Sequence, residues 1–306
     1  MMKPNTSLFI CIIGLLFIGC NSSTSTDNSK PYIVATTGML ADAVKNIVGD
    51  SVIVEALMGP GVDPHLYKAT QGDLTKLTQA SVIVYNGLHL EGKMGEVLEN
   101  LGRRKSVIAG GDGVPKELRR NSTQYENAYD PHIWFDVSKW KLVVEHLSNE
   151  LQVIYPDRAT EFKQNANEYL EKLDVLHSYV TTQIQTIPKR QRTLITAHDA
   201  FEYFGEAYDM EVRGLQGIST VSEFGLRDVT NLVDFIVSKE IKAVFVETSV
   251  SQRAINAVVE GCQQQNFNVV IGGSLYSDAM GKEGTPEGTY IGMVTANVNT
   301  IVNALK

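Results

Sequence analysis

Apolar side chains recur in steps of three and four along the stretch from Pro156 to Pro188. No proline or glycine lies between these two residues, and such spacing buries one face of a 3.6-residue helix. The apolar positions are Phe162, Ala166, Tyr169, Leu170, Leu173, Leu176, Val180, Ile184 and Ile187. At ~1.5 Å per residue the helix would be roughly 45 Å long, the length of a whole domain. The pattern predicts a long helix, either on the surface of one domain or as a rigid rod between two lobes.

Strand-like and helix-like runs alternate on both sides of this stretch. Before it, strands are expected at residues 32–36, 52–57, 82–85 and 106–109, and helices at 39–48, 70–80, 94–101 and 137–154. After it, strands are expected at 193–196, 211–214, 243–246 and 269–271, and helices at 200–208, 227–239, 252–265 and 293–305. Alternation of this kind predicts right-handed βαβ units with parallel strands.

The size of the chain favours the rod over the surface helix. A chain of 306 residues exceeds the usual size of a single hydrophobic core. We therefore predict an α/β fold with an N-terminal lobe (31–155), a linking helix (156–188) and a C-terminal lobe (189–306). The net charge of −8 argues against nucleic-acid binding, because that function favours basic surfaces.

The N-terminus carries a targeting signal. Lys3 precedes an apolar run at residues 8–18, which is too short to span a bilayer but typical of a signal-peptide core. The run ends at Phe-Ile-Gly-Cys (residues 17–20), which resembles a bacterial lipobox. We predict a signal peptide (1–19), lipidation of Cys20 and a flexible Ser/Thr/Asn-rich tether (20–30). The alternative is ordinary secretion with cleavage elsewhere.

Four residues that could bind a metal each lie just after a predicted strand. His65, His132, His198 and Asp278 each follow a predicted strand, the first two in one lobe and the last two in the other. Ligands of open parallel sheets lie at the carboxyl ends of the strands. Two lobes facing each other across a cleft would therefore bring these four side chains together.

Three imidazoles and a carboxylate suit a divalent transition metal. A single histidine is more often a surface or hydrogen-bonded core residue than a ligand. Two of these histidines stand in Asp-Pro-His, where the proline fixes the backbone just before the ring.

Glu247 ends another strand, and is either an acceptor for an imidazole N–H or an acid of the cleft without a metal role. His89, His146 and His177 lie in or beside helical patterns and are interpreted as structural.

Several separate motifs carry a resemblance that covers essentially all of the chain after the signal peptide. They are Asp-Pro-His-Leu-Tyr (63–67), Asn-Gly-Leu-His-Leu-Glu (86–91), Asp-Pro-His-Ile-Trp (130–134), Thr-Ala-His-Asp-Ala-Phe (196–201), Gly-Leu-Gln-Gly-Ile-Ser-Thr (214–220) and Leu-Tyr-Ser-Asp-Ala-Met-Gly (275–281). In this order they resemble the metal-binding lipoproteins of zinc and manganese ABC importers, the class III or cluster A-I solute-binding proteins.

The resemblance implies both a fold and a function. The family has two α/β lobes joined by one long helix, and its ligands correspond here to His65, His132, His198 and Asp278. It implies an extracytoplasmic, lipid-anchored monomer that binds one Mn²⁺ or Zn²⁺ and delivers it to an ABC permease in the membrane. The residues of the motifs are most similar to those of the manganese-binding branch. Many zinc-specific members have a His-rich loop between the first two ligands, whereas residues 66–131 here contain only one histidine, His89. We therefore favour manganese, although imidazoles bind zinc more tightly.

Two other functions compete with metal transport. A zinc-dependent hydrolase would keep one coordination position open for water, whereas four protein ligands would close it. The sequence also contains no His-Glu-x-x-His. A cell-surface adhesin of the same fold without metal would not require these ligands. We therefore predict a binding protein rather than an enzyme.

Overall fold

The computed structural model describes residues 30–122 and 124–306. The predicted signal peptide (1–19), Cys20 and nearly all of the predicted tether (20–30) lie outside the described residues. Among the described residues, no helix combines the length and the apolar character needed to cross a membrane.

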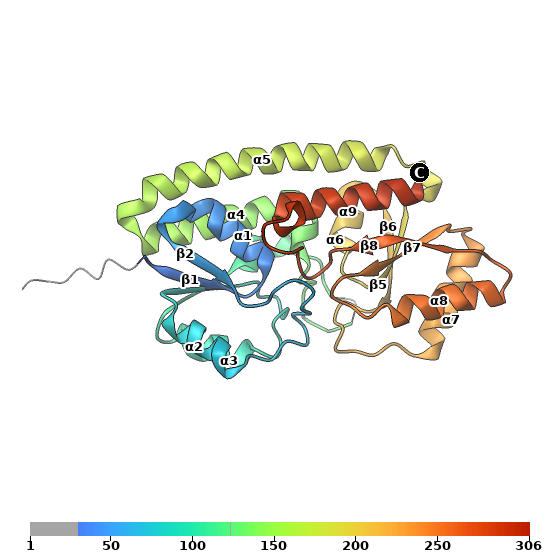
Figure 1. Ribbon diagram of the computed structural model, residues 1–306, viewed down its shortest axis with the longest axis horizontal. Coiled ribbons are helices and arrows are strands. Elements are labelled where there is room, and N and C mark those ends of the chain that lie inside the picture. Colours follow the sequence, from blue (N-terminus) through green and yellow to red (C-terminus); the bar gives the residue numbers. More distant parts are fainter. Residues whose placement is uncertain (1–29, 123) are drawn as a thin grey trace, which may run out of the picture.

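The N-terminal part of the chain folds around one four-stranded parallel sheet. Its strands, in the order β2-β1-β3-β4, are β1 (Tyr32–Ala35), β2 (Ile53–Ala56), β3 (Val82–Tyr85) and β4 (Ser106–Ala109). The helices between them are α1 (Gly38–Val48), α2 (Gln71–Gln79) and α3 (Gly95–Gly102). Alternate side chains of β1 and β3 enter different hydrophobic clusters: Ile33 packs on the α1 side, whereas Val34 packs on the α2–α3 side. Figure 1 shows these helices on opposite faces of the sheet.

The C-terminal part contains two pairs of parallel strands. They are β5 (Thr193–His198) with β6 (Glu211–Gln216), and β7 (Ala243–Glu247) with β8 (Val270–Leu275). The helices are α6 (Glu202–Tyr208), α7 (Leu226–Ser238), α8 (Arg253–Gln264) and α9 (Tyr290–Leu305). The α/β class with parallel strands, predicted from the alternation of apolar patterns, is confirmed.

The long helix α5 spans Ala159–Gln185, after α4 (Val137–Ile154) and a 3₁₀ turn at Pro156–Arg158. It is three residues shorter at each end than the predicted range of 156–188. Pro188 cannot donate a backbone hydrogen bond and disfavours helical geometry in the residue before it, so the helix ends before this proline. Figure 1 shows α5 running along one side of the whole molecule.

The largest hydrophobic cluster connects the two parts of the chain. α5 contacts α1 and α4 towards its start and α6 and α9 towards its end. Buried residues of all these helices belong to one cluster, among them Val44, Phe162, Phe204 and Met293. The N-terminal sheet and the C-terminal strand pairs therefore belong to parts of the chain that pack on the same helices. The division into lobes at residues 155 and 189 stays a prediction.

Candidate metal centre

The four predicted ligands lie together, although their loops come from both the N-terminal and the C-terminal part of the chain. His65 stands in the loop from β2 to α2, and His132 directly precedes a 3₁₀ turn that leads into α4. His198 is the last residue of β5, and Asp278 stands in the loop from β8 to α9. All four side chains are buried, and one ligand atom from each lies within 4.8 Å of the others.

The distances between ligand atoms fit a single metal ion. A metal about 2.1 Å from four tetrahedral ligands holds those ligands about 3.4 Å apart. The His65 and His132 Nε2 atoms are 3.3 Å apart, and His132 Nε2 is 3.5 Å from Asp278 Oδ1. Asp278 Oδ2 is 3.6 Å from His65 Nε2 and 3.3 Å from His198 Nε2. These distances among the three Nε2 atoms and the two carboxylate oxygens match the spacing of a coordination shell.

Three buried polar atoms at this point have no hydrogen-bond partner among the described residues. They are His198 Nε2 and both carboxylate oxygens of Asp278. A buried polar group without a partner costs about 1–3 kcal/mol, and a charged one costs more. A divalent cation would satisfy all three atoms, so the donor set fits a metal.

Two carboxylates orient two of the imidazole rings. Asp130 Oδ1 lies 2.7 Å from His132 Nδ1, and Glu247 Oε2 lies 2.6 Å from His198 Nδ1. Each carboxylate also accepts a hydrogen bond from the backbone N–H of its histidine. A proton held on Nδ1 leaves the Nε2 lone pair free for a metal, which is the usual role of a carboxylate behind a metal-binding histidine.

The ring of His65 has a different environment. Asp63 Oδ1 accepts the backbone N–H of His65 at 2.9 Å. Its other oxygen, Oδ2, accepts the hydroxyl of Thr220 at 2.6 Å, from the loop between β6 and α7. Asp63 therefore connects the His65 loop to the C-terminal part of the chain instead of orienting the ring.

Trp134 joins the loops of two other ligands. Its ring packs edge-to-face on His132, with ring centroids 5.2 Å apart. Its indole N–H donates to the carbonyl of Ser277, the residue before Asp278, at 3.0 Å. Its own carbonyl accepts the hydroxyl of Tyr290 at 2.7 Å. These buried contacts fix the His132 loop against the Asp278 loop.

Burial and charge set the protonation of the group. Burial lowers the pKa of His65 to about 3, so this ring is neutral at physiological pH. Burial alone would lower the pKa of His198, but the carboxylates of Glu247 and Asp278 raise it well above its usual range. Burial would raise the pKa of Asp278, but the imidazoles, first that of His198, hold it below its usual range. The Asp278 carboxylate is therefore ionised and available to a cation.

The family described as zinc-uptake complex component A, periplasmic, matches residues 33–304. The chain belongs to this family. The predicted resemblance to metal-binding solute-binding proteins is thus confirmed.

Two relatives are similar to this chain over almost their full lengths. The manganese-binding lipoprotein MntA of Bacillus subtilis is 49% identical over 288 residues, which cover 94% of each chain. The zinc-binding protein TroA of Treponema pallidum is 46% identical over 284 residues, covering 93% of this chain and 92% of that one. A solved structure of the periplasmic zinc-binding protein TroA superposes with a TM-score of 0.88 over 90% of this chain and 99% of that chain.

Sequence reasoning missed part of what surrounds the ligands. Asp130 belongs to one of the two Asp-Pro-His motifs, but the motif alone does not indicate that its carboxylate holds the ring of His132. Trp134 is buried and connects two ligand loops, and no local signal indicates that contact. Nothing local marked Thr220 as the partner of Asp63. His89 is exposed in a turn with φ of 67° and is not in the ligand group.

Proposed function

We propose that this protein binds one divalent transition-metal ion outside the cytoplasm and delivers it to the permease of an ABC importer. The observation that carries the proposal is the buried group whose ligand atoms lie within 4.8 Å of one another. The proposed ligands are His65, His132, His198 and Asp278, with Glu247 orienting His198. Membership of an uptake-component family supports transport as the role of this binding.

We propose Mn²⁺ as the physiological cargo and Zn²⁺ as a tight competitor. The relative from Bacillus subtilis is named as manganese-binding, and the relative from Treponema pallidum as zinc-binding. Both oxygens of Asp278 lack other partners, so this carboxylate can bind in a bidentate manner and raise the coordination number above four. Mn²⁺ uses carboxylate oxygens readily, whereas three imidazoles favour Zn²⁺ by intrinsic affinity.

The proposed role involves no catalysis. A catalytic zinc has three protein ligands and keeps its fourth position for water. Here four buried protein side chains converge, which closes that position. Capture and release of the ion are therefore sufficient as the function of this centre.

Metal content tests the proposal directly. The protein, expressed without a His tag, should copurify with close to one metal ion per chain, measured by mass spectrometry of the digested sample. Because the ion binds only the folded state, an excess of Mn²⁺ or Zn²⁺ a thousandfold above the dissociation constant should stabilise folding by about 4 kcal/mol. A chain that binds neither ion, or one that hydrolyses esters or peptides with bound zinc, would contradict the proposal.

We propose further that Cys20 anchors the chain to the outer side of the membrane as a lipidated monomer. The lipobox-like residues 17–20 support this attachment, since two or three acyl chains are enough for stable membrane residence. Cys20→Ala should release the protein into the soluble fraction. If that variant stays with the membrane after a carbonate wash, the proposed anchor is wrong.

A further inference from the structure

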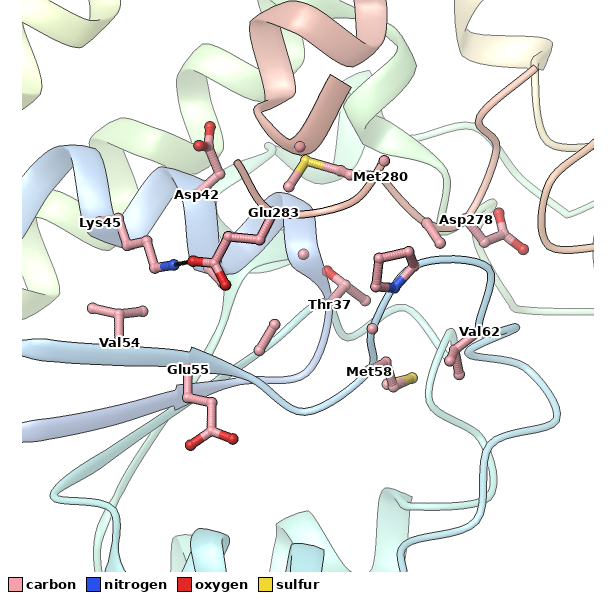
Figure 2. A pocket seen from close by; sticks show the side chains of 18 residues that line it. Thr37, Asp42, Lys45, Val54, Glu55, Met58, Val62, Asp278, Met280 and Glu283 are labelled. Carbon is pink, nitrogen blue, oxygen red and sulfur yellow. Dashed lines mark hydrogen bonds and ion pairs between the residues drawn. The ribbon is translucent and has the colours of Figure 1, made fainter. Parts of the chain in front are cut away.

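Residues of the segment 59–66, which carries His65, line two cavities. Figure 2 shows the first, about 320 Å³, where Val62 and Met58 lie on one side and Asp278 on the other. The second, about 450 Å³, is lined by His65 together with residues of the C-terminal part such as Ser219 and Val221. Neither cavity is lined by His132 or His198. The segment therefore borders both cavities, whereas His132 and His198 border neither.

Few bonds hold this segment in place. Within it, the backbone N–H of Val62 bonds the carbonyl of Gly59, and that of His65 bonds Asp63. In the described part of the chain, a single hydrogen bond ties the segment to the elements after α5, that from Thr220 to Asp63. At 2.6 Å it has the short length typical of a hydroxyl bound to a carboxylate. Thr220 is buried, so little water is available to replace it.

The other ligand loops are held more firmly. His198 is the last residue of a strand. The Glu247 carboxylate holds it through two hydrogen bonds, one to its backbone N–H and one to its ring. The His132 and Asp278 loops are joined through Trp134. Outside the ligand group, the segment that carries His65 therefore has fewer hydrogen bonds to the rest of the described chain than the other ligand loops have.

We propose that the hydrogen bond between Thr220 and Asp63 is a latch that sets the rate at which the metal leaves. This inference rests on the proposed function and adds to it a positioning residue, Thr220, which does not touch the metal. While the latch is closed, one carboxylate holds both the C-terminal loop and the backbone N–H of His65. When the hydroxyl moves away, segment 59–66 shifts into a neighbouring cavity and withdraws His65, while the other three ligands stay in place.

Dissociation kinetics test the latch. Thr220→Val removes the hydroxyl and keeps the branched shape, whereas Thr220→Ser keeps the hydroxyl. Thr230→Val is the matched control, because Thr230 is exposed on α7 and its hydroxyl donates to the carbonyl of Leu226 within the same helix. Each variant is loaded with Mn²⁺ or Zn²⁺ and mixed with excess chelator in a stopped-flow instrument. Thr220→Val should release the ion about tenfold faster or more, as expected for the loss of one hydrogen bond to a charged group.

The controls define how the proposal fails. Thr220→Ser and Thr230→Val should release metal at the wild-type rate, and association rates should be unchanged in all variants. The latch is overturned if the Thr220→Val variant folds and releases metal at the wild-type rate. It is also overturned if the Thr220→Ser variant releases metal as fast as the Thr220→Val variant does. If Thr220→Val does not fold, Thr220→Ala replaces it under the same criteria. A wild-type chain that binds no metal would instead refute the proposed function, so the two failures are distinguishable.

Discussion

The chain contains the tripeptide Asp-Pro-His twice, and the two copies are used differently. In residues 130–132 the aspartate bonds both the backbone and the ring of its histidine, through Oδ1. In residues 63–65 the aspartate bonds the backbone alone and turns its second oxygen to Thr220. The same three residues therefore give one ligand fixed by its own aspartate and one ligand fixed through the opposite part of the chain.

The difference follows from what surrounds each copy. The second copy is buried beside Trp134, whose contacts reach the loop of Asp278. The first copy lies in a loop whose residues line two cavities. A rigid and a movable ligand in one centre would allow tight binding together with release, and neither property requires a wide movement of the lobes.

The largest loss of metal affinity is expected when the histidine of either Asp-Pro-His copy is replaced. His65→Ala and His132→Ala should each weaken metal binding by more than the about 10–100-fold that is typical when a residue behind a ligand is changed. His89→Ala should leave the affinity unchanged, because His89 is exposed and outside the ligand group. Titration calorimetry with Mn²⁺ and Zn²⁺ measures this, and equal losses for His89→Ala and His132→Ala would contradict the ligand assignment.

Exchanging the two aspartates for asparagine sharpens the comparison. Asp130→Asn removes the carboxylate that holds the His132 ring and should weaken equilibrium binding by about 10–100-fold. Asp63→Asn keeps an oxygen acceptor in a residue that does not contact a ring, so its equilibrium effect should be smaller. Competition against a chelator of known affinity gives both values. The comparison fails if Asp63→Asn costs as much as Asp130→Asn.

Trp134→Phe should weaken the contacts that hold the loop of His132. It removes the indole N–H and leaves the buried carbonyl of Ser277 unsatisfied, which should lower the free energy of unfolding by about 1–3 kcal/mol. It should also weaken metal binding, because the loops of His132 and Asp278 would no longer be joined. Urea unfolding with and without metal measures both effects. A variant that loses stability but keeps wild-type affinity would show that Trp134 acts on the fold alone.

The smallest expected effect is on the overall shape. α5 contains no proline or glycine and packs on α1, α4, α6 and α9, so its hydrogen-bond ladder resists bending. Metal loading should therefore produce only a small tilt or a local ordering of loops. Small-angle scattering of metal-free and loaded protein measures the change. A radius of gyration that falls by several ångströms on loading would contradict the rigid helix.

The α/β class and the long helix could be predicted from local patterns. Apolar periodicity reflects which face of each element is buried, and this information is carried by neighbouring residues. The four residues of the ligand group could also be named, because each follows a strand and the carboxyl ends of parallel strands face the same edge. The exact ends of α5 could not be predicted in this way, because Pro156 and Pro188 limit the helix without specifying its first and last turns.

The sequence by itself thus determined the elements, their alternation and the residue types available to a metal. Only the tertiary structure decided what each copy of Asp-Pro-His does. The partner of Asp63 is 157 residues away, and the indole of Trp134 bonds a carbonyl 143 residues away. Such hydrogen bonds depend on how the N-terminal and C-terminal parts pack on their shared helices, and local spacing in the sequence does not specify that packing. The residue types of the proposed ligands are therefore a property of the sequence, and the different contacts that hold their loops are a property of the fold.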